Sequence, residues 1–388
     1  MKNIYLDNSA TTQVDPEVAK VMMEYMVEKY GNPSSIHLYG QQAKYALDDA
    51  REKVAKVINA GIKDIYFTSG GTEADNWAIR GIIEKYIKKN EKAHIVTSRI
   101  EHSAVYDTCR MLEKIYPEIV SITYIKPDPK GYITPEQVEG AITNDTKLVS
   151  IMHVNNEIGN INDITSIGKL CRNKGVLFHT DAVQSYTKVP IDVKAMNIDI
   201  LSASAHKIYG PKGVGLLYLR NKVEIVPITF GGHQESNQRN GTENLPGIIG
   251  FGKAAEIAQN AYETDIPRIA SLKKKLYEII SKGVKDIVVN GDLVNGYEGV
   301  LNISFHGIEG ESLLLALDLE GVCVSTGSAC SAGSVKPSRV LLALGKGEEE
   351  AQSSIRFSIG RNNTMEEIEF TGNAVIKSVE RLRSMAWM

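Results

Sequence analysis

Three stretches of the sequence carry residues that could together bind an anionic, reactive cofactor. The first is FTSGGTEADN (67–76), in which two glycines lead from an apolar run into a helical pattern. Such a turn presents backbone N–H groups and the positive end of a helix to an anion, and Thr72 adds a hydroxyl. Taken alone, the same residues also fit an ordinary tight turn that Thr72 caps.

The second and third stretches end apolar runs with charged residues. VLFHTDAVQS (176–185) carries Asp181, and LSASAHKIYGPKG (201–213) carries Lys207. Ligands of open α/β sheets bind at the carboxyl ends of strands, and a lysine partly removed from water there becomes a nucleophilic amine. Each residue alone also fits a surface acid or a solvated lysine. With the glycine turn they match the needs of pyridoxal phosphate, namely a phosphate cradle, an acid at the ring nitrogen and a Schiff-base lysine.

A fourth stretch, STGSACSAG (325–333), surrounds the thiol of Cys330 with small residues. Because so little apolar side chain surrounds it, we predict a mobile, reactive cysteine rather than a buried structural one. Cys323 alternates within a strand pattern, and Cys109 and Cys171 fall within helical patterns, so we expect these three to pack. The chain contains no HExxH motif and no CxxC pair, and we expect no resident metal.

Length and composition indicate a globular protein of two domains. The 388 residues exceed one ordinary core, and 44 lysines and arginines nearly balance 47 aspartates and glutamates, which predicts no nucleic-acid or membrane-surface binding. No apolar run reaches the length of a membrane span, and the opening MKNIYLDNSATT lacks the pattern of a signal peptide. Four cysteines in so long a chain suggest a reducing compartment, so we expect a cytoplasmic location.

Apolar strands and helical patterns alternate along most of the chain, which predicts an α/β fold with a mainly parallel sheet. After about Asn260 the pattern changes to that of a smaller α+β domain, which begins with two helical stretches. We therefore expect a large domain of residues 15–260 and a small domain of residues 1–14 and 261–388.

In their order and spacing, the motifs of this chain resemble those of the cysteine desulfurases of the NifS/IscS type, which belong to the class-V aminotransferases. The resemblance runs essentially from end to end. It rests on these stretches: YLDNSATT, GNPSSIH, SGGTEADN, EHSAV, HVNNEIG, HTDAVQS, SAHKIYGPKGVG, STGSACSAG and SSIRFSIGR. It implies the pyridoxal-phosphate-dependent aspartate-aminotransferase fold (type I). In that fold a mainly parallel seven-stranded sheet forms the large domain, and the smaller α+β domain carries a mobile cysteine loop at about residues 325–336.

The resemblance also implies roles for individual residues. Lys207 would hold pyridoxal phosphate as a Schiff base, Asp181 would pair with the ring nitrogen, and His102 would stack on the ring and move protons. The ring hydroxyl and the phosphate would be bound by Asn156, Gln184, Gly71, Thr72, Ser204, His206 and, from a second subunit, Thr242. Arg356 would grip the substrate carboxylate with its bidentate fork, and Asn32 would line the substrate pocket.

The implied activity is the removal of sulfur from L-cysteine, which yields L-alanine and a persulfide on Cys330. Lys207 would abstract the α-proton, the thiolate of Cys330 would attack the substrate sulfur, and His102 could take up the thiol proton. The persulfide would pass to an acceptor protein, either an iron–sulfur scaffold or a tRNA-thiolation enzyme, and Cys330 could serve transiently as a cluster ligand. A homodimer is implied as well.

The chain departs from the family pattern in a few places. His233 stands where a third glycine is usual, Ser236 and Asn237 replace an Arg-Gly pair, and Ala205 replaces a glycine. The ending SMAWM is shorter than the tail with which some relatives dock the scaffold protein. Two alternatives stay open: another pyridoxal-phosphate reaction, such as transamination or selenocysteine lysis, and a non-catalytic sulfur carrier. The thiol of Cys330 argues against transamination, and the set of catalytic side chains argues against a mere carrier.

Overall fold

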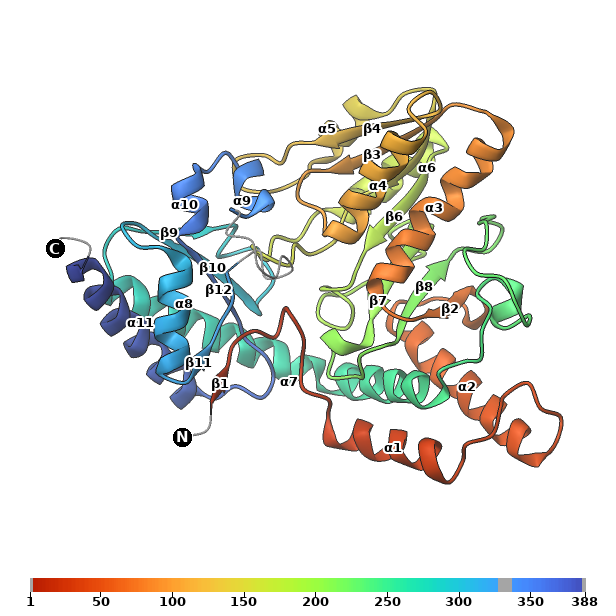
Figure 1. Cartoon of the computed structure of the whole chain (residues 1–388), viewed down its shortest axis with the longest axis horizontal. Helices are drawn as coiled ribbons and strands as arrows, with labels where there is room; N and C mark the ends of the chain where they lie inside the picture. The colour runs from red at the N-terminus through yellow and green to blue at the C-terminus, as the bar shows by residue number, and fades with distance from the viewer. Residues whose placement is uncertain (1–2, 327–336, 386–388) are drawn as a thin grey trace.

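The computed structural model describes residues 3–326 and 337–385, and a seven-stranded sheet forms the centre of its larger part (Figure 1). The strand order is β2, β8, β7, β6, β5, β3, β4; β8 runs antiparallel to both of its neighbours, and the other neighbours pair in parallel. The strands span Ile65–Thr68 (β2), Ala93–Ser98 (β3), Val120–Ile125 (β4), Thr146–Ser150 (β5), Leu177–Asp181 (β6), Ile200–Ser204 (β7) and Gly215–Leu219 (β8). The mainly parallel seven-stranded sheet predicted from the sequence is confirmed.

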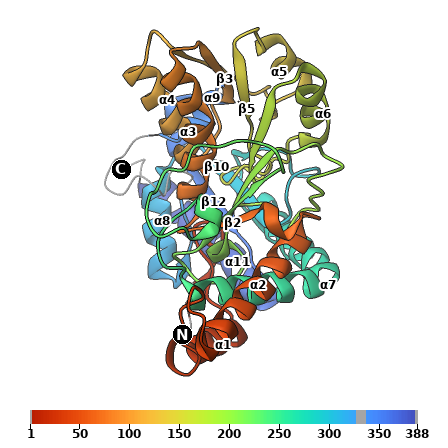
Figure 2. The ribbon, with the colours of Figure 1, turned by 90° about the vertical axis from the view of Figure 1, so that its right-hand side faces the viewer.

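Helices cover both faces of this sheet, because successive strand residues point to opposite sides. Leu217 of β8 belongs to the apolar cluster beneath α3 and α4, whereas Leu216 belongs to the cluster with α2, α5, α6 and the start of α7. The two helix layers are visible on either side of the sheet in Figure 2. These helices span Pro16–Val27 (α1), Leu38–Val57 (α2), Gly71–Lys89 (α3), Ser103–Ile115 (α4), Pro135–Ala141 (α5) and Ile164–Lys174 (α6), with a short 3-10 turn at Ile62–Asp64 (η1).

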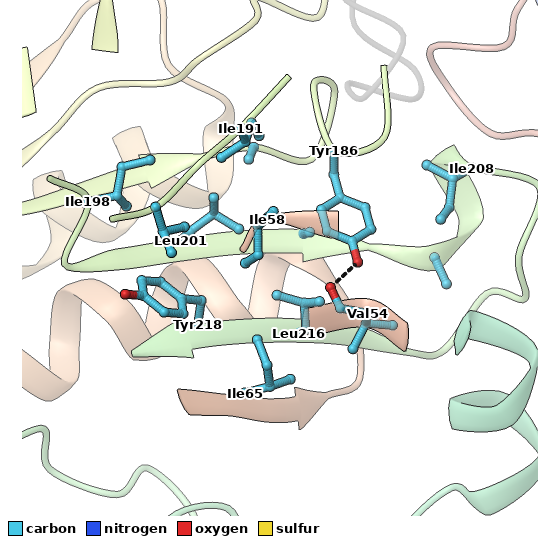
Figure 3. Packing of buried hydrophobic residues seen from close by; sticks show 14 of the residues in the cluster. Val54, Ile58, Ile65, Tyr186, Ile191, Ile198, Leu201, Ile208, Leu216 and Tyr218 are labelled. Carbon is cyan, nitrogen blue, oxygen red and sulfur yellow. Dashed lines mark hydrogen bonds between the residues drawn. The ribbon is translucent and has the colours of Figure 1, made fainter. Parts of the chain in front are cut away.

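The core on the α2 side is built largely from branched aliphatic residues and includes two buried tyrosines, Tyr186 and Tyr218 (Figure 3). Tyr186 is fully buried, and its hydroxyl donates a hydrogen bond to the carbonyl oxygen of Val54 at 2.8 Å. Because that bond satisfies the polar end of the ring, the aromatic area contributes to stability without leaving an unpaired polar atom. The contact joins α2 to the segment that follows β6, where the predicted cofactor acid lies.

The second part of the molecule is built on an antiparallel sheet in the order β12, β10, β9. A separate apolar cluster joins this sheet to α8, to α11 and to the start of the chain, where Leu6 is fully buried. The elements here span Ile4–Tyr5 (β1), Ile287–Asn290 (β9), Val300–Phe305 (β10), Val322–Cys323 (β11), Ser354–Ser358 (β12), Gly310–Leu319 (α8), Arg339–Ala343 (α9), Glu348–Gln352 (α10) and Met365–Met385 (α11). The domain boundary at residue 260 stays a prediction.

Helix α7 (Leu245–Gly283) connects the two parts and differs from the two helical stretches expected after Asn260. It continues for 39 residues through Pro267. A proline normally interrupts a helix because it removes one N–H and leaves the carbonyl four residues earlier unpaired. Here Glu263 and Pro267 are both exposed, so water can satisfy that carbonyl and the helix continues.

Candidate active site

A cavity of about 420 Å³ opens at the carboxyl ends of β6 and β7, beside the start of α3. This is the edge at which open α/β sheets bind ligands. The cavity brings together most of the predicted site residues: Gly71, Thr72, His102, Asn156, Asp181, Gln184, Ser204, His206, Lys207 and Arg356. Five further lining residues were not predicted: Ser9, Ala10, Asp75, Met152 and Val183.

The glycine turn at the start of α3 forms one wall of the cavity. Gly70 is the N-cap residue, with φ 156°, and among the described residues no side chain caps the helix there. The alternative interpretation, in which Thr72 caps the turn, is therefore wrong. A Cβ atom on Gly71 would approach Cγ2 of Val183 to 2.7 Å, so only glycine lets the turn pack this closely. The amides at this helix end stay available for an anion.

Ser204 and His206 lie on the strand-to-turn segment opposite this helix end. Ser204 ends β7 and is 2% exposed, and its Cβ lies 3.7 Å from where a Cβ on Gly71 would be. Burial and the nearby lysines, first Lys207, lower the pKa of His206 to about 4, and its Nδ1 lies 3.1 Å from Oγ1 of Thr11. His206 is therefore a neutral hydrogen-bonding group rather than a cation at neutral pH.

Asp181 is the last residue of β6, and its side chain is buried. Its Oδ1 accepts a hydrogen bond from the backbone N–H of Val183 at 2.8 Å. Burial raises the pKa of this carboxyl, while His102, the Val183 amide and Lys207 act in the opposite direction. The alternative of a surface acid is excluded by the burial, and these three neighbours favour an ionised carboxylate.

Lys207 lies in the 3-10 turn Ala205–Lys207 (η2) directly after β7. Its Nζ donates to the carbonyl oxygen of Ala10 at 2.7 Å and to that of Ser9. Gln184 donates to the same Ser9 carbonyl at 2.9 Å. The N-terminal YLDNSATT stretch thus positions the lysine. The sequence gives no sign of this role, because the contacts are made by backbone carbonyls rather than by side chains.

Arg356 lies in β12 of the second sheet, yet its guanidinium reaches the cavity and is only 3% exposed. Its Nη2 donates to Oδ1 of Asp7 at 2.9 Å and its Nη1 to the carbonyl oxygen of Asn156 at 3.0 Å. Arg356 also exchanges two backbone hydrogen bonds with Ser325, at 2.7 and 3.3 Å. The strand that carries the arginine is therefore tied to the start of the STGSACSAG stretch.

His102 is the N-cap residue of α4, where its Nδ1 accepts a hydrogen bond from the Ala104 amide at 3.1 Å. An acceptor Nδ1 places the proton of a neutral ring on Nε2. His102 thus caps a helix and also lines the cavity.

Two predicted site residues lie apart from this group, and a third is not among the described residues. Asn32 is exposed, and its side chain accepts from the Ser34 amide at 2.9 Å to close a local turn. Thr242 is exposed and does not line the cavity. Cys330 lies outside the described residues.

The loop in which the chain departs from the family pattern is tied to α3. Arg239 donates to Oε1 of Glu73 at 2.8 Å, and Glu73 in turn accepts from the Ser69 amide. His233 has φ 71°, a left-handed conformation that glycine adopts without strain. This backbone conformation explains why a glycine is usual at this position.

Within residues 3–326 and 337–385, no helix has the length and apolar character needed to cross a bilayer. The same residues contain no cluster of three or more metal-ligating side chains.

The comparisons with known proteins agree with this geometry. Residues 4–370 match the family model described as aminotransferase class-V. The chain belongs to the aminotransferase class-V family. Its relatives include the cysteine desulfurase IscS of Shewanella sp. (strain MR-4), which is 49% identical over 99% of this chain and 94% of the relative. The IscS of Shewanella sediminis is 50% identical over the same shares.

Two solved structures are similar to this chain over most of its length. A NifS-like protein matches with a TM-score of 0.91 at 36% identity, over 98% of this chain and all of that one. A structure described as SspA in complex with cysteine matches with a TM-score of 0.82 at 36% identity, over 93% of this chain and 100% of that one.

Proposed function

We propose that this chain is a cysteine desulfurase that uses pyridoxal phosphate to convert L-cysteine into L-alanine and a persulfide on Cys330. The observation that carries the proposal is the single cavity lined by Lys207, Asp181, Arg356 and the uncapped start of α3. Relatives named cysteine desulfurase, at about half identity over nearly the whole chain, support the same activity.

The cavity residues fit pyridoxal phosphate in size and chemistry. The backbone amides at the start of α3, together with Ser204 and His206, could donate hydrogen bonds to the phosphate. The buried carboxylate of Asp181 could pair with the protonated ring nitrogen. Two buried polar atoms facing this region, Oε1 of Gln184 and Nε of Arg356, have no hydrogen-bond partner among the described residues. Buried polar groups normally have partners, so these atoms indicate a polar ligand. When bound, the cofactor supplies an electron sink for the negative charge that develops at the substrate α-carbon.

The side chains of the chain then bind and orient the substrate. Arg356 pairs with the α-carboxylate, since its guanidinium is already held by Asp7 and Asn156 and retains a free Nε–H. Lys207, which lines the cavity and is held by the Ser9 and Ala10 carbonyls, takes the α-proton. His102, with a proton on Nε2, would stack on the ring, where it could donate that proton and then take one back.

Sulfur transfer uses the thiolate of Cys330. It attacks the substrate sulfur, so an S–S bond forms on Cys330 as the carbon–sulfur bond of cysteine breaks, and a proton replaces sulfur on the substrate β-carbon. The net change is L-cysteine plus a thiol giving L-alanine plus a persulfide, with no external oxidant. An acceptor protein for iron–sulfur cluster assembly or tRNA thiolation would take the persulfide, in the cytoplasm.

We infer further that the active form is a homodimer. Eight large apolar side chains are exposed along α1 and α2 and the turn between them, here called the α1–α2 patch: Met23, Met26, Val27, Tyr30, Ile36, Leu38, Tyr39 and Tyr45. Patches of this kind mark interaction surfaces. In the dimer, Thr242 of a second copy would reach the phosphate.

The test measures sulfide and alanine released from L-cysteine in the presence of a reductant. The unmodified protein should form both in equal amounts. Cys330→Ala should keep the absorbance of the bound cofactor but form neither product, and Lys207→Ala should alter that absorbance. Cys323→Ala, which removes a half-buried thiol outside the cavity, should retain activity. Full activity of Cys330→Ala would instead indicate another pyridoxal-phosphate reaction, and inactivity of a cofactor-loaded unmodified protein would indicate a carrier.

A further inference from the structure

A second carboxyl lies in the cavity beside the proposed cofactor acid. Asp75, in the first turns of α3, is 1% exposed and lines the same cavity as Asp181. Its Oδ1 has no hydrogen-bond partner among the described residues. The sequence motif that contains Asp75 was interpreted only through its glycines and Thr72, and the reaction proposed above does not use this carboxyl.

The groups that face Asp75 offer it no positive charge. On β6, His179 is completely buried and its Nε2 lies 3.6 Å from Oδ1 of Asp75, but burial lowers the pKa of His179 to about 3, so the ring is neutral. That ring is already engaged by Ser150 at 2.8 Å and by Ser202 of β7 at 3.0 Å. Within the described ranges, no lysine or arginine lies within 4 Å of Asp75.

The remaining titratable neighbours of Asp75 are acids. Asp181 lies on β6, and Glu101, after β3, is buried and bonded to Ser98 at 2.5 Å and to the Met152 amide at 3.2 Å. Burial raises the pKa of Glu101 to about 8, so this group is largely neutral at pH 7. Burial and the charge of Asp181 raise the pKa of Asp75 well above its usual range, opposed only by the Ser202 hydroxyl.

Asp181 differs from Asp75 because it has favourable partners. His102, Lys207 and the Val183 amide all stabilise its ionised form. Two buried carboxylates at one site cannot both ionise without a large electrostatic cost. The proton is therefore expected on Asp75, whose ionised form is favoured only by the Ser202 hydroxyl and whose Oδ1 has no hydrogen-bond partner among the described residues.

We propose that Asp75 is a positioning residue that stays protonated and therefore neutral. Because Asp75 carries no charge, Asp181 can remain the ionised carboxylate of the cavity. The catalytic consequence of this inference rests on the proposed function. If Asp75 were ionised, its charge would favour protonation of Asp181, and the ring nitrogen would lose its anionic partner. An amide has the shape of a protonated carboxyl, so asparagine can replace Asp75 but not Asp181.

The test compares Asp75→Asn with Asp181→Asn in the full-length protein. With pyridoxal phosphate bound, Asp75→Asn should keep the cofactor absorbance, its pH titration and at least half of the alanine-forming rate. Asp181→Asn should change the absorbance titration and lower the rate by about 100-fold or more. A loss of similar size in Asp75→Asn would overturn the inference.

A second readout does not depend on activity. A carboxyl whose pKa is raised on folding binds its proton more tightly in the folded state, so it lowers stability as pH rises from its unfolded pKa toward its folded pKa. Asp75→Asn removes this effect. Its melting temperature should therefore exceed that of the unmodified protein at pH 8, and the gap should shrink toward pH 5. Glu101 is present in both proteins and cancels in the comparison.

A lower melting temperature of Asp75→Asn at pH 8 would show that the ionised carboxyl is the stabilising form and would refute the inference. If Asp75→Asn does not fold, Asp75→Ser, which keeps a small neutral polar group, is measured in the same way. Failure of the proposed function is distinguishable, because the unmodified protein would then form no alanine while the pH-dependent stability gap persists.

Discussion

Arg356 illustrates, at the scale of single residues, how a side chain from one sheet completes a site built on another. Its guanidinium group already donates hydrogen bonds to Asp7 and to the carbonyl oxygen of Asn156. Lysine offers one point charge and cannot maintain both contacts while binding a carboxylate. We therefore expect Arg356→Lys to raise KM for L-cysteine by about 10-fold or more, with cofactor absorbance unchanged.

Steady-state kinetics of alanine formation checks this expectation. Arg220→Lys is a suitable control, because Arg220 pairs with Asp199 at 2.5 Å away from the cavity and its replacement should leave KM unchanged. An unchanged KM in Arg356→Lys would mean that the substrate carboxylate is bound elsewhere.

Strand-end residues were the most predictable part of the site. Asp181 and Lys207 each follow an apolar run, and a parallel sheet brings such ends to one edge. Asp75 was missed because an acid within a helical pattern is normally a solvated residue, and its burial depends on how α3 packs over β7. Asn32 and Thr242 do not line the cavity of this chain, and no contact described here tests the role of Cys330.

At the scale of elements, two helical glycines differ in the space around them. Gly168 in α6 is buried, and a Cβ there would lie 2.0 Å from the carbonyl oxygen of Met196. Gly140 in α5 is exposed, with nothing within 4 Å. Gly168→Ala should lower the free energy of unfolding by about 1–3 kcal/mol. Gly140→Ala should raise it by up to about 1 kcal/mol through helix propensity.

Denaturant unfolding of the two variants measures both effects on one protein. Equal stabilisation by the two alanines would contradict the close approach of α6 to the Met196 carbonyl. Neither glycine lines the cavity, so cofactor binding should be retained in Gly140→Ala.

Most helices and strands could be predicted from the periodicity of apolar residues, but the direction of β8 and the continuity of α7 could not. Buried strands such as β7 and β8 read as continuous apolar runs because both of their faces are covered. The antiparallel direction of β8 has no signature within its own residues. Likewise, two helical stretches were expected where α7 continues across Pro267, because solvation of the Glu263 carbonyl depends on which side of the helix faces water.

At the scale of the whole molecule, the α1–α2 patch carries a prediction about assembly. Ile36 is 91% exposed and Tyr45 is 78% exposed, and both views place α1 and α2 at the same end of the molecule. We expect an Ile36→Asp, Tyr45→Asp double variant to be monomeric where the unmodified protein is dimeric, because a dimer would bury these charges. The monomer should also bind pyridoxal phosphate more weakly, since it lacks the Thr242 of a second copy.

Sedimentation analysis and cofactor titration test both parts of this prediction. Val294→Asp changes an equally exposed apolar residue outside the patch and should leave the dimer intact. A double variant that remains dimeric would place the interface on another surface.

Helix α7 contributes side chains to two separate apolar clusters. Leu245, Ile248 and Phe251 near its start belong to the core of the seven-stranded sheet, and Leu272 and Leu276 near its end belong to the core of the three-stranded sheet. At about 1.5 Å per residue the helix is close to 60 Å long. Loss of this one helix would therefore expose both cores to water at once. We therefore expect heating to melt the two cores in a single cooperative transition rather than one after the other.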